Sequence, residues 1–261
     1  MTKSFIESFH VNMKDPNVVV LAISLAANLT SSYRDVSNMS TLCINKFDIK
    51  EITIVTDNAQ KVQVNNPKVT IVVPTNKVDF LGRITEFVAR VQQKSTIVFT
   101  LSAHGYTKKA SRDRIAFEMD KHTEYIKFGN EMITDTELFE ALYSKMHDSI
   151  KSVCFIDTCH SGTMLDLEYL SNDGKTFHRS PVANMSRPDS VCISACSDNE
   201  LVGEDISEYG GWGGKLTCAL LDYLHLLQGT TLSPILFYRH IHTIFTAQTT
   251  QRSVPIISFN E

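Results

Sequence analysis

The segment from Val153 to Gly162, VCFIDTCHSG, joins the features of a buried strand to those of a reactive site. Its first four residues are all apolar, which is typical of a strand buried on both faces of a parallel sheet. An acid, a threonine, a cysteine, a histidine, a serine and a glycine follow directly. Because ligand sites gather at the carboxyl ends of parallel strands, this segment predicts a functional site at the end of a central strand.

The rest of the chain alternates between short apolar runs and segments of helical periodicity, which predicts an α/β fold with a mostly parallel sheet of about six strands and helices on both faces. The expected strands are Val18–Ile23, Ile52–Val55, Thr96–Leu101, Val153–Ile156, Val191–Ser194 and Val254–Ser258. The expected helices are a segment around Tyr33–Cys43, Val78–Val91 with Thr75 or Asn76 as cap, Asp135–His147 with a capping-box spacing from Thr134 to Glu137, Leu216–Leu227 ending at Gly229, and Ser233–Phe245 opened by Ser233-Pro234.

Two segments interrupt this alternation. Arg114–Met119 and Thr123–Phe128 flank Asp120-Lys121-His122 and predict a small hairpin appended to the main sheet. Residues 168–188 are rich in turn-forming pairs and predict an exposed linker. We expect one domain over residues 1–261, with this linker between a part formed by residues 1–167 and a part formed by residues 189–261.

Composition excludes several classes of protein. The formal net charge of -4 and a pI near 6.1 give no electrostatic footprint for nucleic acid or an anionic membrane. The most apolar segment, Val18–Leu29, is too short and too polar to span a bilayer, and the first 15 residues lack the apolar region of a signal peptide. The 6 cysteines do not resemble a disulfide framework in a chain of 261 residues, so we expect a reducing, cytoplasmic location and a monomer.

A second polar cluster supplies the partner that the thiol needs. The third expected strand runs into Ser102-Ala103-His104-Gly105, and strands joined by one crossover are usually neighbours. His104 is a better base for Cys159 than the adjacent His160, because successive side chains leaving a strand point apart. The amides of Gly105 and Cys159 are then candidate donors to an oxyanion.

Other interpretations of these residues remain possible from the sequence. A buried cysteine is most often a small hydrophobe, which is the interpretation we give to Cys43, Cys154, Cys192 and Cys218. A zinc site could draw on Cys154, Cys159, His160, Cys192 and Cys196, but their spacing lacks the paired C-x2-C of structural zinc sites. The run Gly210–Lys215 superficially resembles a phosphate loop, yet Tyr209 and Leu216 stand where glycine and Ser or Thr are required, so we discard it.

The paired motifs resemble those of caspase-like cysteine peptidases, and in particular the metacaspases. Asp157-Thr158-Cys159-His160-Ser161-Gly162 is close to the metacaspase motif D-S-C-H-S-G, and His104-Gly105 lies about 50 residues before it, as in that family. The stretch Asp35–Met39 is similar to the family's N-D-A-x-N-M segment. Weaker landmarks are Pro74-Thr75, Val191–Asn199 and Leu216–Leu221. The resemblance covers nearly the whole chain and implies a caspase-like α/β/α sandwich without a long prodomain, with residues 1–167 and 189–261 similar to large and small subunits.

The resemblance also implies an activity and a set of site residues. Cys159 would be the nucleophile and His104 the general base of an endopeptidase that cuts protein or peptide substrates after Arg or Lys. The matching positions for the pocket that receives that side chain are Asp35, Ser102, Asp157 and Asp166. Lys175, Arg179 and Arg187 in the expected linker would then be sites of self-cleavage. The alternative is a catalytically silent caspase-like scaffold that binds basic peptides.

One departure from the family concerns metal ions. Many metacaspases carry an acid-rich loop between the histidine and cysteine strands that binds activating calcium. Here the stretch Thr107–Asp113 is short and mostly basic, and Asp113 and Asp120 are the aspartates of this region, whereas calcium takes six to eight oxygen ligands. We therefore expect no cofactor, no metal ligands and no strict dependence on calcium.

Overall fold

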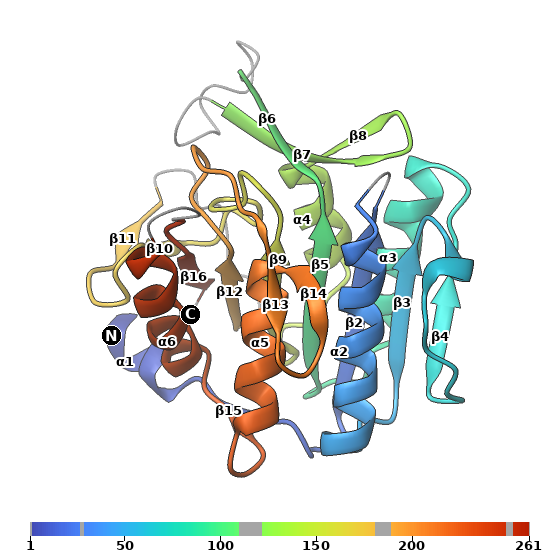
Figure 1. Ribbon diagram of the computed structural model, residues 1–261, viewed down its shortest axis with the longest axis horizontal. Helices are drawn as coiled ribbons and strands as arrows, with labels where there is room; N and C mark the ends of the chain where they lie inside the picture. The colour runs from blue at the N-terminus through green and yellow to red at the C-terminus, as the bar shows by residue number, and fades with distance from the viewer. Residues whose placement is uncertain (1, 27–28, 110–121, 181–188, 249–252, 261) are drawn as a thin grey trace.

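A computed structural model describes residues 2–26, 29–109, 122–180, 189–248 and 253–260 (Figure 1). Within this part of the chain, nine strands form the main sheet, and six of them run parallel to one another. In spatial order the parallel strands are β4 (Val69–Val72), β3 (Ile52–Thr56), β2 (Val18–Leu25), β5 (Thr96–Ala103), β9 (Lys151–Asp157) and β12 (Ser190–Ser194). The α/β class and the parallel sheet expected from the sequence are confirmed.

Antiparallel strands complete the sheet beyond β12. The strand β16 (Ile256–Asn260) pairs with β12, β10 (Tyr169–Ser171) pairs with β16, and β11 (His178–Arg179) pairs with β10. The chain's last expected strand therefore exists, but it begins two residues later than predicted and runs against its neighbours. Sequence patterning did not predict the edge strand β4. Its residues are mostly half-buried, and its short sequence contains no clear apolar run.

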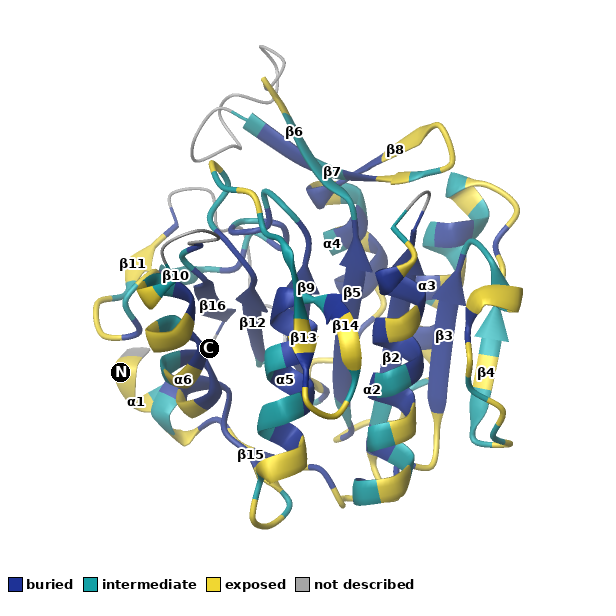
Figure 2. Cartoon of the chain, in the orientation of Figure 1, coloured by how far each residue is buried: buried dark blue, intermediate teal, exposed yellow. Residues whose placement is uncertain are grey.

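Helices cover both faces of the sheet, because successive strand residues point to opposite sides. One face packs against α1 (Thr2–Ser8), α2 (Ser31–Phe47), α5 (Lys215–Leu226) and α6 (Pro234–Ala247), and the other packs against α3 (Lys77–Arg90) and α4 (Asp135–Tyr143). In β2, for example, Val20 and Ala22 face the first group while Leu21 and Ile23 face the second. Figure 2 shows the resulting layers, with the central strands dark blue between the two sets of helices.

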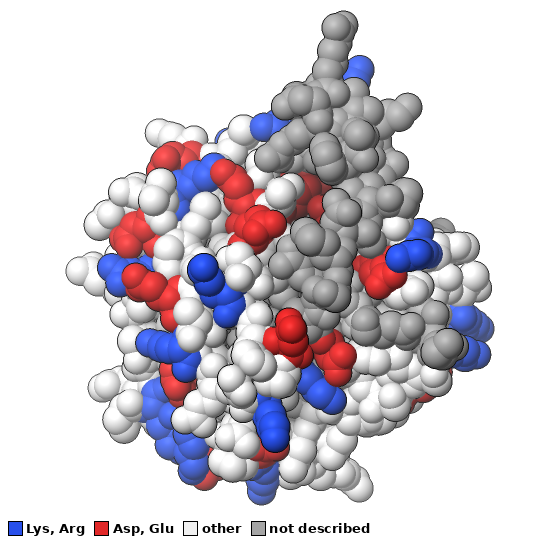
Figure 3. Space-filling model, turned by 180° about the vertical axis from the view of Figure 1, so that it is seen from behind, with Lys and Arg blue, Asp and Glu red and all other residues white. Residues whose placement is uncertain are grey.

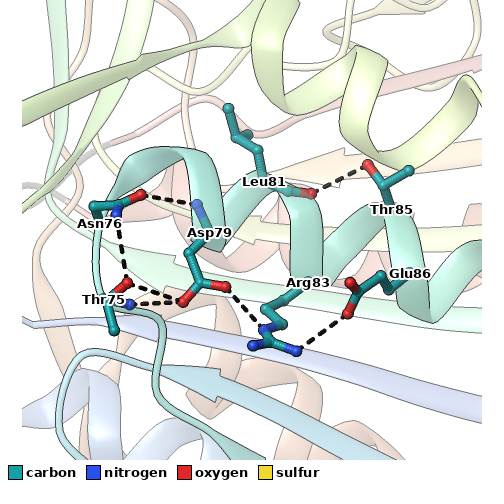
Figure 4. Close-up of polar contacts among 7 residues, drawn as sticks. All are labelled: Thr75, Asn76, Asp79, Leu81, Arg83, Thr85 and Glu86. Carbon is teal, nitrogen blue, oxygen red and sulfur yellow. Dashed lines mark hydrogen bonds and ion pairs between the residues drawn. The ribbon is translucent and has the colours of Figure 1, made fainter.

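Local sequence signals explain where two of these helices begin. Asn76 caps α3 by accepting a hydrogen bond from the Asp79 amide at 2.9 Å, and the Asp79 carboxylate accepts one from the Thr75 amide at 2.8 Å (Figure 4). The expected capping box at α4 is present between Thr134 and Glu137. The helix α5 ends at Leu226, before the Gly229 that we expected to cap it.

Three smaller units are attached to this frame. A three-stranded antiparallel sheet consists of β6 (Gly105–Lys109), β7 (His122–Phe128) and β8 (Glu131–Thr134), and lies beyond the carboxyl ends of β5 and β9 (Figure 1). The hairpin of β13 (Glu204–Ser207) and β14 (Gly211–Gly214) lies before α5, and β1 (Val11–Asn12) pairs with β15 (Thr231–Leu232). A short 3-10 turn, η1, spans Ala59–Lys61.

The appended hairpin therefore differs from the expectation. The predicted strand over Thr123–Phe128 exists as β7, but its described partners are β6 and β8, and the predicted partner Arg114–Met119 lies outside the described residues. Sequence patterning missed β6 because only one of its five residues is strongly apolar or aromatic.

The segment 168–188 also differs from an exposed linker. Its first part contributes β10 and β11 to the main sheet, and the rings of Tyr169 and Phe177 each lie 5.3 Å from that of Phe259. Because the segment is mostly polar, its sequence did not predict these aromatic contacts. Residues 181–188, which include Arg187, lie outside the described part of the chain.

The described surface carries charges of both signs. On the face seen from behind, basic and acidic side chains are interspersed (Figure 3). Among the described residues, the structure contains no helix that is both long and apolar enough to cross a membrane.

Candidate active site

The two polar clusters emerge from adjacent parallel strands. β5 and β9 pair in register through Ser102 and Asp157, so His104 and Cys159 each follow at the same edge of the sheet. The expectation that these strands are neighbours is confirmed.

Gly105 fixes how closely the two strand ends approach each other. A Cβ atom at this position would lie 1.8 Å from the carbonyl oxygen of Cys159 and 2.9 Å from Thr158 Oγ1. Because backbone atoms cannot yield at such a distance, the position requires glycine. The chain after β5 therefore touches the chain after β9 beside the candidate nucleophile.

Cys159 differs from the other cysteines in its exposure. All 6 cysteines are unpaired thiols, and Cys159 is the one that is not buried. Burial raises the pKa of Cys43, Cys154, Cys196 and Cys218 to about 12. Reactive cysteines are partly exposed, so the structure favours Cys159 as the reactive thiol on accessibility alone.

The Cys159 thiol is held by one neighbouring backbone residue. Its Sγ atom lies 3.5 Å from the carbonyl oxygen of Val202 and 3.4 Å from the Val202 amide nitrogen. Partial burial and the nearby charge of Asp157 raise the thiol pKa, and the Val202 amide opposes this rise. In the described conformation these surroundings therefore favour the neutral thiol over the thiolate.

His160 contacts the loop of residues 198–202, whose Val202 also contacts the thiol. Its backbone is in the left-handed region, with a φ of 52°, and its ring nitrogen Nδ1 lies 2.5 Å from the carbonyl oxygen of Asp198. The His160 amide donates to the carbonyl of Glu200 at 3.2 Å, and the Thr163 amide donates to the Asp198 carboxylate at 2.9 Å. These contacts hold the turn after Cys159 and leave His104 as the candidate base.

Three of the four predicted pocket residues lie together. Asp35 on α2, Ser102 on β5 and Asp157 at the end of β9 are all buried. Ser102 donates to Asp35 at 2.6 Å, and the amide of Gly214 lies 3.2 Å from both carboxylate oxygens of Asp35. The Thr217 amide in the first turn of α5 donates to Asp157 at 2.7 Å.

Two glycines pack directly against these carboxylates. A Cβ atom on Gly213 would lie 2.3 Å from Asp35 Oδ1, and one on Gly214 would lie 2.4 Å from Asp157 Oδ2 and 3.1 Å from Asp35 Oδ2. The Cβ position of Gly214 is thus within 3.1 Å of both acids, which brings Asp35 and Asp157 close to each other. We call these two residues the acidic pair.

Burial shifts the titration of the acidic pair toward neutral pH. Desolvation and the charge of Asp157 raise the pKa of Asp35 to about 7, although hydrogen bonds from Ser102 and Gly214 oppose the rise. Desolvation raises the pKa of Asp157 to about 6, with hydrogen bonds from Thr217 and Leu216 and the charge of Lys215 acting against it. Two buried carboxylates close together form an electrostatically costly site even with the charge of Lys215 acting on Asp157, and a cationic ligand would lower that cost further.

Asp166, the fourth predicted pocket residue, lies nine residues after Asp157 in the chain, and its place in the pocket stays a prediction. It follows β9 in a turn in which its amide donates to the carbonyl of Thr163 at 2.8 Å, and its φ of 41° is left-handed. Asp35 accepts hydrogen bonds from Ser102 and Gly214, and Asp157 accepts one from the Thr217 amide.

Lys175 and Arg179 are exposed on the hairpin of β10 and β11. The Lys175 amide donates to Asp173 at 2.7 Å, and Arg179 forms an ion pair with Glu168 at 2.9 Å. Both predicted self-cleavage positions therefore lie in ordered chain, and Arg187 lies outside the described residues.

Several residues that shape this site could not be identified from the sequence. The role of Val202 cannot be predicted from its side chain, because its backbone atoms make the contact. Asp198 belongs to the stretch Val191–Asn199, which resembles a family strand, and nothing in that pattern indicates its contact with His160. In the sequence, Gly213 and Gly214 belong to the run that superficially resembles a phosphate loop. A Gly-Gly pair also indicates a close approach of the backbone to a neighbouring group. Lys215, which is 1% exposed, contacts Ser253 at 3.2 Å and the Phe245 ring at 4.3 Å.

The zinc interpretation finds no support in the described residues, where no group of three or more His, Cys, Asp or Glu side chains is placed to hold a metal ion. The thiols of Cys159 and Cys196 instead contact backbone carbonyls. Asp113 and Asp120 lie outside the described residues, so the expectation about calcium stays a prediction.

An α/β/α sandwich with a cysteine and a histidine at neighbouring strand ends is the arrangement of the caspase-like fold class. The model of the family "Metacaspase, peptidase C14 domain" matches residues 17–168, which is more than half of the chain. The chain therefore belongs to the metacaspase family.

Known relatives agree with this assignment. The chain is 27% identical over 206 residues to metacaspase-5 of Trypanosoma brucei brucei, covering 74% of this chain and 39% of the relative. It is 32% identical over 120 residues to inactive metacaspase-4 of the same organism, covering 42% of this chain and 33% of the relative. The chain thus spans little more than a third of these relatives. Protein GSU0716 of Geobacter sulfurreducens shares the fold, with a TM-score of 0.55, 18% identity and coverage of 94% of this chain and 92% of that one.

Proposed function

We propose that this chain is a cysteine endopeptidase that cleaves after Arg or Lys, with Cys159 as nucleophile and His104 as general base. The observation that supports this specificity most is the acidic pair, whose two carboxylates are buried beside the strand end that carries the candidate nucleophile. Its substrates would be proteins or peptides. We also propose that it acts as a monomer in a reducing, cytoplasmic compartment, because its six thiols are unpaired.

The acidic pair suits the P1 side chain, which is the residue before the bond to be cut. A guanidinium offers five donors in a fixed fork, and a lysine ammonium offers a compact charge. Either cation would offset the repulsion between Asp35 and Asp157 and lower both pKa values. A P1 aspartate would add a third negative charge, which costs on the order of several kcal/mol.

The chemical steps follow from the roles assigned. His104 removes the thiol proton of Cys159, and the sulfur attacks the scissile carbonyl carbon. The amides of Gly105 and Cys159 donate to the oxyanion that forms. His104 then gives its proton to the leaving amine, and water hydrolyses the remaining thioester to release the acid product and the thiol.

The contact between Cys159 and Val202 has a place in this scheme. The Val202 backbone occupies both the donor and acceptor directions of the thiol, at 3.5 and 3.4 Å. A scissile carbonyl reaches the sulfur only when this contact opens. We infer that productive binding of a substrate displaces Val202 from Cys159.

The same contact favours a second candidate function, a silent scaffold that binds basic peptides. A neutral thiol held by Val202 would leave the acidic pair able to bind a cation without cleavage. One relative bears the name inactive metacaspase-4, which is consistent with members of the family that do not cleave. Turnover, rather than binding, separates the two functions.

The decisive experiment is turnover of peptides that differ only at P1, with Arg, Lys, Asp and Ala compared. We expect cleavage after Arg, weaker cleavage after Lys and essentially none after Asp. Cys159→Ala and His104→Ala should each abolish turnover while leaving the fold intact. Asp157→Ala should lose about 2–5 kcal/mol of transition-state stabilisation for Arg substrates.

A measurable preference for P1 Asp would show that the pocket is assigned wrongly. Turnover that survives in Cys159→Ala would show that the nucleophile is assigned wrongly. Binding of Arg peptides by the wild type without any cleavage would support the silent scaffold instead.

A further inference from the structure

The outer face of the three-stranded sheet carries an ordered set of lysine and tyrosine side chains. Tyr106 on β6 and Tyr125 on β7 are direct cross-strand partners, and their rings stack with centroids 5.2 Å apart and planes 17° apart. The Nζ atom of Lys127 lies 4.6 Å from the Tyr106 ring centre, and that of Lys108 lies 5.7 Å from the Tyr125 ring centre. We call these four residues the lysine–tyrosine stack.

The lysine–tyrosine stack lies on the open side of this small sheet. Residues on the opposite face, such as Ile126 and Ile133, are fully buried against the core. Lys108 and Lys127 are exposed and the two tyrosines are half-buried. Figure 2 shows the strand β6 in the colours of intermediate and exposed residues.

Among the described residues, the lysines of this face outnumber the acids that pair with them. Neither Lys108 nor Lys127 forms an ion pair within the described part of the chain. A hollow of about 380 Å³ adjoins the stack and contains Lys77, Lys108 and Lys109 but only one acid in its lining, Glu137, which already pairs with Lys77 at 2.6 Å. A ligand on this surface would therefore meet a local excess of cations.

This surface is continuous with the catalytic histidine. His104 stands two residues before Tyr106, and their ring centres are 6.3 Å apart. In the proposed mechanism, His104 gives its proton to the leaving amine, so the residues after the scissile bond depart on the His104 side. The P1 side chain enters on the other side, toward the acidic pair on α2 and β9, and β6 leads away from that pocket (Figure 1).

We propose that the lysine–tyrosine stack binds the leaving-group side of the substrate and that the enzyme prefers acidic residues in the first positions after the scissile bond. This inference rests on the proposed peptidase function. An extended chain rises ~3.3 Å per residue, so about three or four residues beyond the scissile bond span the distance from His104 to the far end of the stack. Tyrosine rings supply apolar contact for these residues, and the lysines select their charge.

The surface complements the acidic pocket on the other side of the scissile bond. A preferred sequence would carry a cation just before the bond and anions just after it. Such a pattern excludes substrates with a run of basic residues, because lysine beside lysine is repulsive. The enzyme would thus discriminate between an isolated basic residue and a polybasic segment.

The test uses internally quenched peptides with P1 Arg that differ only at the second and third positions after the scissile bond, which are Glu-Glu, Gln-Gln or Lys-Lys. For the wild type we expect kcat/KM to fall in that order, with about two- to fivefold between successive peptides, as exposed charge pairs allow. The ratio should shrink in 0.5 M salt, where the Debye length falls to about 4 Å or less.

Charge reversal identifies the residues responsible. Lys127→Glu and Lys108→Glu, alone and together, should shrink or invert the ratio of the Glu-Glu to the Lys-Lys peptide, and Lys127→Gln should give an intermediate ratio. The ratio within one enzyme cancels any change in overall activity. Lys145→Glu is the matched control, because Lys145 is exposed in the connection that enters the amino end of β9, at the opposite edge of the sheet.

An arginine peptide that carries only a fluorophore after the scissile bond separates the two hypotheses. If the wild type fails to cleave it, the proposed function is wrong and this inference falls with it. If the wild type cleaves it but shows equal kcat/KM for the three quenched peptides, this inference alone is wrong. A charge preference that Lys127→Glu and Lys108→Glu leave unchanged would also overturn it.

Discussion

Replacing Asp35 by asparagine should make the protein more stable and less active at the same time. The pKa of Asp35 rises from 3.8 to about 7 in the folded protein, mainly because the carboxyl is desolvated. A group whose folded pKa is raised destabilises the fold as pH increases through the interval between the two values. At pH 8, a shift of this size corresponds to about 4 kcal/mol of lost stability, at 1.36 kcal/mol for each pKa unit.

The variant should recover only part of this free energy. Asparagine keeps one acceptor but replaces the other carboxylate oxygen by a donor, so the bonds from Ser102 and Gly214 are not both retained at full strength. With a loss of about 1 kcal/mol for a weakened hydrogen bond, we expect Asp35→Asn to be about 1–3 kcal/mol more stable than the wild type at pH 8. Near pH 4, where the native carboxyl is neutral, the gain should vanish.

Urea unfolding of both proteins at pH 4 and pH 8 measures this difference. Asp148→Asn serves as the control, because Asp148 is exposed and distant in sequence from the site. In the same preparation, kcat/KM for an Arg peptide should fall at least ~30-fold, which corresponds to about 2 kcal/mol. Equal or lower stability of Asp35→Asn at both pH values would refute the electrostatic reasoning, and unchanged cleavage after Arg would refute the pocket.

Other predictions follow from the same geometry. The rate of Arg cleavage should increase with pH between about 5 and 8, because the acidic pair binds a cation only when it is ionised, and a profile that is flat over this range would contradict that. Gly105→Ala should reduce kcat/KM at least ~100-fold, since its Cβ would collide with the carbonyl of Cys159, and a fully active alanine variant would mean that the two strand ends separate freely. Activity should survive chelation of calcium; a titration with no turnover until micromolar calcium is added would show that calcium ligands have been overlooked. Fragments ending after Lys175, Arg179 or Arg187 should accumulate in the wild type but not in Cys159→Ala, with intact masses as the readout. Of these three positions, Lys175 at a hairpin turn should be cut more readily than Arg179, which is paired within β11.

The sequence predicted the fold through its apolar runs. Each buried parallel strand has a continuous run such as Val18–Ile23, and such runs identify strands without any knowledge of tertiary contacts. The strand β4 and the hairpin of β10 and β11 lack this signal, because their stability comes from contacts with chain far away, such as that of Tyr169 with Phe259. Local patterning carries no information about such partners.

The candidate site likewise contains residues that the sequence predicts and residues that it does not. His104 and Cys159 were predictable because side-chain chemistry at a strand end is visible in sequence. The contact of Val202 with the thiol was not, since any residue could supply those backbone atoms. The resemblance predicted the acidic pair. The close packing of Gly213 and Gly214 against its carboxylates was not predictable, because it depends on how the β13–β14 hairpin packs against α2.

The order of strands at one edge of the main sheet determines what a break in the chain would do. From the edge inward the order is β11, β10, β16, β12 and β9, so the later strands β16 and β12 lie between the earlier strands β10 and β9. A cut between β10 and β12 would leave two pieces, with each piece holding a strand of the other by backbone hydrogen bonds. Such a nicked molecule would migrate as two bands under denaturing conditions and as one species in native size-exclusion chromatography. Its halves would behave as an interlocked heterodimer made from a single gene product.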